Sequence, residues 1–323
     1  MLVPRTIEPH MKIFRLRHIN LHLLIVPILS AAVIGGIFFY NERSKYNGPI
    51  GQRKEIAAFE TFFVETLARG QTNKNFKLNR FPMDVEICVF STEDNDIKQQ
   101  ILLLASLLKE ETYIRPFTVF KKDIYSCPNS TFLYFRVHQG GPKTISGLVG
   151  DISYIANISG INSHIDTEFS EYGMGLVMTD GDRDKAYIAV NEFIDKKGEI
   201  DRVFVRSVVQ QEFVQTFLMA PDIEVSRIPI SIIEERDYYY IGKDSEDKYK
   251  KNVKVRMEMN ARNMCLYDIM LLNTLYSRDI EDIRSGTLGV YINYIRAHYG
   301  EIEESARRIQ NDPRYKELFV SKC

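Results

Sequence analysis

The residues best placed to do chemistry are Gln211, Glu212 and Gln215, in the stretch Gln-Glu-Phe-Val-Gln. On a helix, positions four residues apart share a face one turn apart. Two histidines at this spacing would hold a zinc ion, and the glutamate beside the first would activate a zinc-bound water. Glutamine offers only a neutral amide oxygen instead. The spacing is that of a metal site, but the residue types predict that no metal binds.

The sequence around this stretch predicts a helix. Residues 203–218 contain few turn residues, and their apolar side chains recur at helical spacing. Two further helices are expected over 260–277 and 286–309. Gln211 and Gln215 therefore share one face of a helix in the second half of the chain.

Helices and strands are expected to alternate in the preceding part of the chain. The apolar periodicity predicts helices over 53–69, 94–111 and 143–159, and strands over 85–90, 117–120, 132–137 and 175–178. Residues 183–197 are also predicted to be helical, with the acidic run 180–184 as a turn and N-cap. A calcium loop is disfavoured there, because Lys185 and Asn191 stand where glycine and glutamate are needed. The fold class expected is α/β (α+β).

The Gln-Glu-Phe-Val-Gln stretch is followed by further landmarks. Residues 211–222 resemble the extended metzincin motif H-E-x-x-H-x-x-G-x-x-H/D, and Ser231-Ile232-Ile233 falls where the methionine turn would come. Leu266-Tyr267-Asp268 with Leu275-Tyr276 resembles the last metzincin helix. The combination is most similar to the exported bacterial domain-of-unknown-function family 2927, over roughly residues 144–303, with Ser285-Gly286-Thr287 as its glycine-rich end.

This resemblance implies a metzincin-like domain with a mixed sheet and long helices. Gln211, Gln215 and Pro221 would then be relics of the three zinc ligands. The candidate cleft would be formed by Glu212, Ser231, Ile233 and Tyr276. Without a metal, Glu212 is expected to be structural, hydrogen-bonded to backbone or to Tyr276. No catalytic residue, metal or cofactor is expected, and Glu212 would be catalytic only in a divergent hydrolase.

The N-terminal region predicts a single transmembrane helix. Residues 23–40 are 18 residues without a charge, about 27 Å as a helix, which is close to the thickness of a hydrocarbon core. A cleaved signal peptide is the alternative, but the apolar run continues past the candidate cleavage site at 30–32. Basic residues before the span favour a cytoplasmic N-terminus. This places the bulk of the chain outside the cytoplasm, and the resemblance to an exported bacterial family then implies a bacterial inner-membrane protein with its bulk in the periplasm.

These observations divide the chain into five parts. They are a cytoplasmic N-terminus (1–22), the transmembrane helix (23–40), a linker (41–52), a helix with an α/β unit (53–142) and the metzincin-like domain (143–323).

The chain has 42 basic and 43 acidic residues, which gives no indication of nucleic-acid binding.

The spacing of the cysteines and histidines predicts no metal site. Cys88, Cys127, Cys265 and Cys323 lack metal-site spacing. If the body is exported, Cys88 with Cys127 is the disulfide we expect, although buried free thiols are the alternative. Three histidines follow the span, at 138, 164 and 298, and none has a partner at ligand spacing.

Three functions are compatible with the sequence. The first is a membrane-anchored, non-catalytic module that binds a peptide or an envelope protein. The second is a divergent hydrolase or metallopeptidase that uses Glu212. The third is a structural component of an envelope assembly, in which the amphipathic helix over 53–69 drives self-association.

Overall fold

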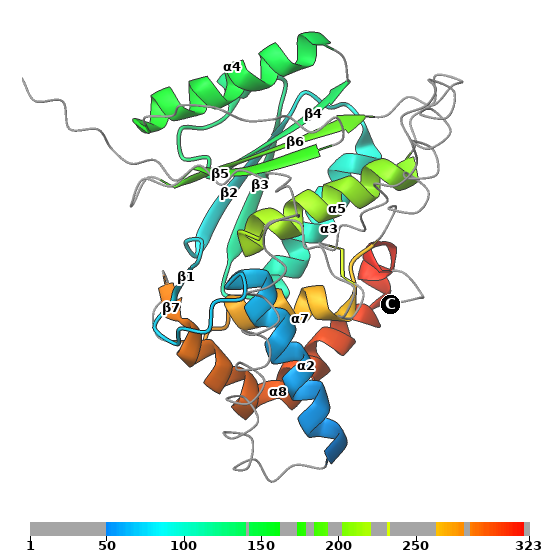
Figure 1. Cartoon of the computed structure of the whole chain (residues 1–323). Helices are drawn as coiled ribbons and strands as arrows, with labels where there is room; N and C mark the ends of the chain where they lie inside the picture. Colours follow the sequence, from blue (N-terminus) through cyan, green and yellow to red (C-terminus); the bar gives the residue numbers. More distant parts are fainter. Residues whose placement is uncertain are drawn as a thin grey trace, which may run out of the picture.

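Figure 1 shows the computed structural model of the chain, which describes residues 50–139, 142–161, 173–178, 184–192, 202–220, 231–232, 263–280 and 285–319. The predicted membrane helix at 23–40 and the candidate positions Pro221 and Ile233 lie outside these residues. Across the described ranges, no helix has the length and apolar character to span a membrane.

The centre of the fold is a mixed five-stranded sheet with strand order β3-β2-β4-β6-β5. The strands are β2 (Asp84–Phe90), β3 (Arg115–Lys121), β4 (Leu133–Gln139), β5 (Gly173–Met178) and β6 (Lys185–Glu192). All neighbours are parallel except β5, which runs antiparallel to β6. The mixed α/β architecture expected from the sequence is therefore present, and the sheet contains strands from both sides of residue 142.

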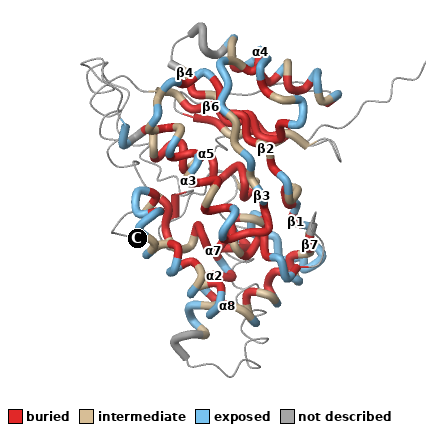
Figure 2. The backbone as a smooth tube through the Cα atoms, turned by 180° about the vertical axis from the view of Figure 1, so that it is seen from behind, coloured by how far each residue is buried: buried red, intermediate tan, exposed pale blue. Residues whose placement is uncertain are grey.

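Both faces of the sheet are buried. Along β4, Leu133, Phe135 and Val137 belong to the large core on one face, whereas Tyr134 belongs to a smaller core on the other. Successive side chains of a strand point to opposite faces, so one strand supplies both cores. Figure 2 shows the resulting concentration of buried residues in the strands.

The prediction of a helix over 183–197 is wrong, because this segment contains the strand β6. β6 lies between β4 and β5, and every residue from Ala186 to Val190 is buried. A strand covered on both faces has a continuous apolar run instead of an alternating one. Asp184 directly precedes the strand and caps no helix, and the other acidic residues of the expected N-cap lie outside the described residues.

Helices cover the two faces of the sheet (Figure 1). The helix α4 (Pro142–Ser159) lies on the side of the smaller core, and α3 (Asn95–Glu111) and α5 (Arg202–Leu218) lie on the other side. All three agree with the sequence-based prediction. α4 ends before Gly160, whose φ of 66° is in the left-handed region that favours glycine at a helix end.

A helical layer lies beneath α3 and α5 in Figure 1. It contains α2 (Ile50–Leu67), α7 (Leu266–Leu275), α8 (Leu288–Gln310) and the short 3₁₀ helix η4 (Pro313–Leu318). The helix predicted over 260–277 is shorter than expected. Ser285–Thr287, expected as a glycine-rich end, forms β7 and pairs antiparallel with β1 (Lys77–Asn79).

The apolar face of α2 is buried within the chain. Phe59 contacts the rings of Tyr267 and Tyr299, and Phe63 contacts Tyr291, at centroid distances of 5.6, 6.2 and 5.6 Å. These tyrosines belong to α7 and α8. The apolar face of the amphipathic helix predicted over 53–69 is therefore covered by the body of the chain.

The expected disulfide between Cys88 and Cys127 is present, with a Cα–Cα distance of 5.9 Å and a sequence separation of 39 residues. It joins β2 to the end of the short 3₁₀ helix η3 (Ile124–Ser126). Both cysteines belong to the smaller core. The bond therefore fixes the segment after β3 to the sheet.

Candidate functional site

The Gln-Glu-Phe-Val-Gln stretch lies on α5, as predicted, but this helix is mostly buried. α5 packs against β5 and β6 on one side and against α3 and α7 on the other. Glu212 is only 9% exposed, and Gln215 is also buried. The face that would carry a metal in an active zinc enzyme is thus part of the packed interior, and only Gln211 is partly exposed.

The Glu212 carboxylate lies against two glycines of the edge strand β5. A Cβ atom on Gly173 would be 3.0 Å from Glu212 Oε1 and 2.5 Å from Val208 Cγ1. A Cβ atom on Gly175 would be 3.3 Å from Glu212 Oε2 and 2.6 Å from Thr216 Oγ1. Glycine at both positions therefore allows α5 to approach the edge strand closely.

Gly173 and Gly175 were not among the predicted site residues. They are two residues apart on a strand, so they share one face, and the apolar residues Met174 and Leu176 point to the other face. A Gly-x-Gly pattern inside an otherwise apolar strand is a signal of close backbone approach. It could have identified the strand that lies beside Glu212.

The second predicted landmark, Ser231-Ile232, is hydrogen-bonded to the third, the helix α7 that contains Asp268. The buried Asp268 carboxylate accepts hydrogen bonds from the Ser231 hydroxyl, from the Ile232 amide at 3.1 Å and from the Cys265 amide at 2.7 Å. Asp268 thereby caps α7 and holds the preceding turn. Next to the motif, Gln210 Oε1 accepts from the Met264 amide at 3.1 Å. These bonds join the turn and α5 to the start of α7.

Tyr276 has a structural position at the end of α7. Its hydroxyl donates to the Phe217 carbonyl on α5, and its ring contacts Tyr113 at a centroid distance of 5.6 Å. Burial raises the pKa of this phenol well above its ordinary value. The buried Arg80 lies nearby, with its guanidinium 5.4 Å from the Tyr113 ring, and donates to three carbonyls, at Leu275, Ser277 and Ile280.

The described residues supply no metal site. Among them, no group of three or more His, Cys, Asp or Glu side chains is arranged to hold a metal ion. A carboxylate alone does not lower the pKa of water as a bound metal does. What the structure shows around Glu212 is close packing of α5 against β5.

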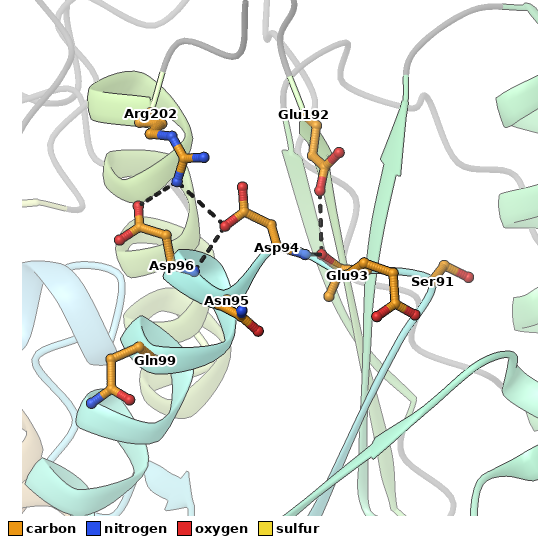
Figure 3. Close-up of a pocket in the computed structure, with 9 residues that line it drawn as sticks. Ser91, Glu93, Asp94, Asn95, Asp96, Gln99, Glu192 and Arg202 are labelled. Carbon is orange, nitrogen blue, oxygen red and sulfur yellow. Dashed lines mark hydrogen bonds and ion pairs between the residues drawn. The ribbon is translucent and has the colours of Figure 1, made fainter.

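A cavity of about 900 Å³ lies elsewhere, where β2 and β6 end and where α3 and α5 begin. Figure 3 shows its wall, which is lined by Ser91, Thr92, Glu93, Asp94, Asn95, Asp96, Gln99, Glu192 and Arg202. None of the predicted site residues belongs to this wall. Arg202 is ten residues before Glu212 on α5, which corresponds to roughly 15 Å along a helix.

Two carboxylates of this cavity, those of Asp94 and Asp96, hold α3 and α5 in place. Asp94 caps α3 by accepting from the Asp96 amide at 2.8 Å, and Arg202 lies 3.4 Å from both carboxylates. Arg206 forms a two-point ion pair with Asp96, and this hydrogen bonding lowers the pKa of Asp96. The cavity wall therefore joins α3 to α5 and contains no histidine, cysteine or lysine.

Comparison with protein-family models, with curated proteins and with solved structures gives no match to this chain.

Proposed function

We propose that this chain is a membrane-anchored, extracytoplasmic module with a metzincin-like fold that binds an extended peptide or a segment of an envelope protein without cleaving it. The three landmarks that resemble the domain-of-unknown-function family 2927 support the fold. Asp268 and Gln210 connect them in space. The loss of both histidines supports the absence of metal-dependent hydrolysis.

The observation that carries the binding function is the edge strand β5. In the described part of the chain it pairs with β6 alone, so its other side has no strand neighbour there. An extended peptide can add to such an edge through main-chain hydrogen bonds, which requires no metal. Glu212 and the two glycines set the position of this strand against α5.

The proposed location is supported by the disulfide. Cys88–Cys127 joins two buried residues in the interior. Such structural disulfides persist in oxidising compartments, among them the bacterial periplasm, and are rare in the cytosol. Together with the apolar stretch at 23–40, this favours a tethered body outside the cytoplasm.

The binding function is tested by hydrogen exchange on the full chain in detergent or nanodiscs. A set of overlapping peptides from envelope proteins is screened for binding, and amide exchange is then measured with the best binder. We expect protection in residues 173–178. Protection confined to other segments, or no binder in the screen, would contradict the proposal.

A separate assay addresses the hydrolase. The full chain and its Glu212→Gln variant are incubated with a peptide library, with and without added zinc, and the products are identified by mass spectrometry. We expect no cleavage by either protein. Cleavage by the native chain that disappears in a folded Glu212→Gln variant would replace the binding proposal by a hydrolase.

A further inference from the structure

The opposite edge of the sheet, β3, exposes large aromatic side chains. Phe117 is 64% exposed, Phe120 is 36% exposed, and Tyr125 in the following η3 is 73% exposed. Isolated apolar residues on a surface are ordinary, but here three exposed aromatic side chains lie within nine positions of one edge segment. We call these residues, with the strand between them, the β3 edge.

The aromatic side chains lie on both sides of β3. Val119 packs against the smaller core beneath α4, so Phe117, two residues away, points to the same side. Phe120 points to the other side, where Lys98 of α3 lies 5.9 Å from its ring centroid. A segment added to this edge would therefore meet an aromatic ring on each of its two faces.

The backbone of β3 has unused pairing capacity. β3 pairs with β2 in parallel, and the described residues include no other strand beside it. The Arg115 amide donates to the Met83 carbonyl, so every second residue from Arg115 faces β2. The amides of Thr118 and Phe120 consequently point outward. Pro116 has no N–H, which limits an added strand to the second half of the edge.

The β3 edge has a basic side chain at each end of the strand, and only the one at the N-terminal end has an acidic ion-pair partner among the described residues. Lys121 and Lys122 are exposed and form no ion pair within the part of the chain that the structure describes. At the other end, Arg115 is paired with Asp84. If two copies paired antiparallel about Thr118, Arg115 of each would face Lys121 of the other, and like charges directly opposite are destabilising. The charge pattern disfavours self-association and favours an acidic partner.

We propose that the β3 edge binds an extended acidic segment of a second protein, which adds to the sheet outside β3 and places apolar side chains against Phe117 and Phe120. This interaction goes beyond the proposed peptide binding at β5. Within the described ranges neither outer strand of the sheet, β3 or β5, is paired on its outer side, so two partners can bind the same sheet at the same time.

The test uses two synthetic peptides of about ten residues, long enough to span the strand. In one peptide pairs of glutamates alternate with pairs of valines, which places valine on both faces of a strand, and in the other lysine replaces glutamate. Binding to the full chain is measured by fluorescence anisotropy at low and high salt. We expect the acidic peptide to bind more tightly than the basic one, with an affinity that falls as salt rises.

Charge-reversal variants locate the site. Lys121→Glu with Lys122→Glu should weaken binding of the acidic peptide by roughly tenfold or more. The matched control is Lys54→Glu with Lys316→Glu, which makes the same charge change on α2 and η4. We expect the control to bind like the native chain, and thermal unfolding of each variant verifies that it is folded.

Hydrogen exchange on the native chain gives a result that does not depend on any variant. Bound acidic peptide should protect residues 117–122, with β5 unchanged. The inference is wrong if the acidic peptide does not bind, if both double variants weaken it equally, or if the protected amides lie elsewhere. A dimer of the native chain that Phe117→Ala dissociates would assign this edge to a second copy instead. If the peptide binding proposed at β5 is disproved, the outcomes of this test at the β3 edge keep their meaning.

Discussion

Asp268 shows how single buried polar residues organise this fold. Its carboxylate is fully buried and accepts from two backbone amides and one hydroxyl, two of them on the turn at 231–232. The sequence indicated Asp268 as part of a landmark helix, but gave no means to find its partners, because the turn is 37 positions earlier. Long-range pairing of this kind depends on the packed structure.

Replacing this carboxylate is expected to destabilise the protein. Asp268→Asn keeps one acceptor oxygen and removes the charge, so we expect the free energy of unfolding to fall by about 2 kcal/mol. Urea unfolding monitored by circular dichroism measures the change. Asp84→Asn, at an exposed ion pair, is the matched control and should alter the free energy of unfolding by less than about 1 kcal/mol. Equal effects of the two variants would refute the assigned role.

Asp96 gives the protein a pH-dependent contribution to stability. Hydrogen bonding to Arg206 lowers the pKa of Asp96 in the folded state. The ionised form is therefore the one that stabilises the fold, fully above the unfolded-state pKa, and this stabilisation is lost as the pH falls through the lower folded-state pKa. We expect Asp96→Asn to lower stability by about 0.5–1 kcal/mol at neutral pH, because the pair is partly exposed.

The measurement is the unfolding midpoint of both proteins from neutral to strongly acidic pH. The difference between them should shrink as the pH falls. Arg206→Gln removes the same ion pair from the other side and should show the same trend. A difference that stays constant with pH would show that Asp96 does not act through its charge.

At the scale of helices and strands, periodicity predicted the helices that cover the sheet well and failed at one interior strand, β6. The predicted helices at 94–111, 143–159 and 203–218 each have one face on the sheet and were found within a few residues. β6 is apolar on both sides, so it has no period of two that would distinguish it from a buried helix. The two-strand pairing of β1 with β7 was also missed, because these strands are only three residues long.

The two glycines of β5 provide a test of how the edge strand is positioned. Gly175→Ala would place a methyl group 2.6 Å from Thr216 Oγ1 and should push β5 away from α5. We expect a loss of stability of about 1–3 kcal/mol, as for other overpacked sites, and weaker peptide binding at this edge. Gly150→Ala is the matched control, because beyond its chain neighbours and the backbone of its own helix no atom lies within 4 Å of the added Cβ. A Gly175→Ala variant with the stability of the native chain would contradict the close packing of β5 against α5.

The disulfide is expected to stabilise the element pair that it connects. Replacing both Cys88 and Cys127 by serine opens a loop of 39 residues, which should lower the free energy of unfolding by about 2–4 kcal/mol. Denaturant unfolding of the double variant and of the native chain, both without reductant, measures this. If the midpoints coincide, the bond does not constrain the segment after β3.

At the scale of the whole molecule, α2 packs against α7 and α8 and is therefore part of the folded body of the chain. Glu60 on α2 and Arg296 on α8 form a buried two-point ion pair with N–O distances of 2.7 and 3.0 Å. The sequence predicted the amphipathic helix and its buried face, but could not show which surface covers it. The candidate site was predicted in the same incomplete way, with the helix and the glutamate but without the strand beside them.

This ion pair can be examined by a double-mutant cycle. Arg296→Met leaves the Glu60 carboxylate buried without its partner, which should cost about 3–5 kcal/mol. The variant carrying both Glu60→Met and Arg296→Met should be more stable than Arg296→Met alone, because no unpaired charge remains. If the stability losses of the single variants Glu60→Met and Arg296→Met add up to the loss of the double variant, the two residues do not interact.

The position of this contact has a mechanical consequence. α2 is the first element that the structure describes, so a force that enters the chain from its N-terminal side meets the Glu60–Arg296 pair and the aromatic rings around Phe59 before it meets any strand. The sheet with its two edges is thereby shielded from tension until α2 is pulled off α7 and α8. In single-molecule pulling from the N-terminus, the first rupture should accordingly be the detachment of α2, with the sheet still intact.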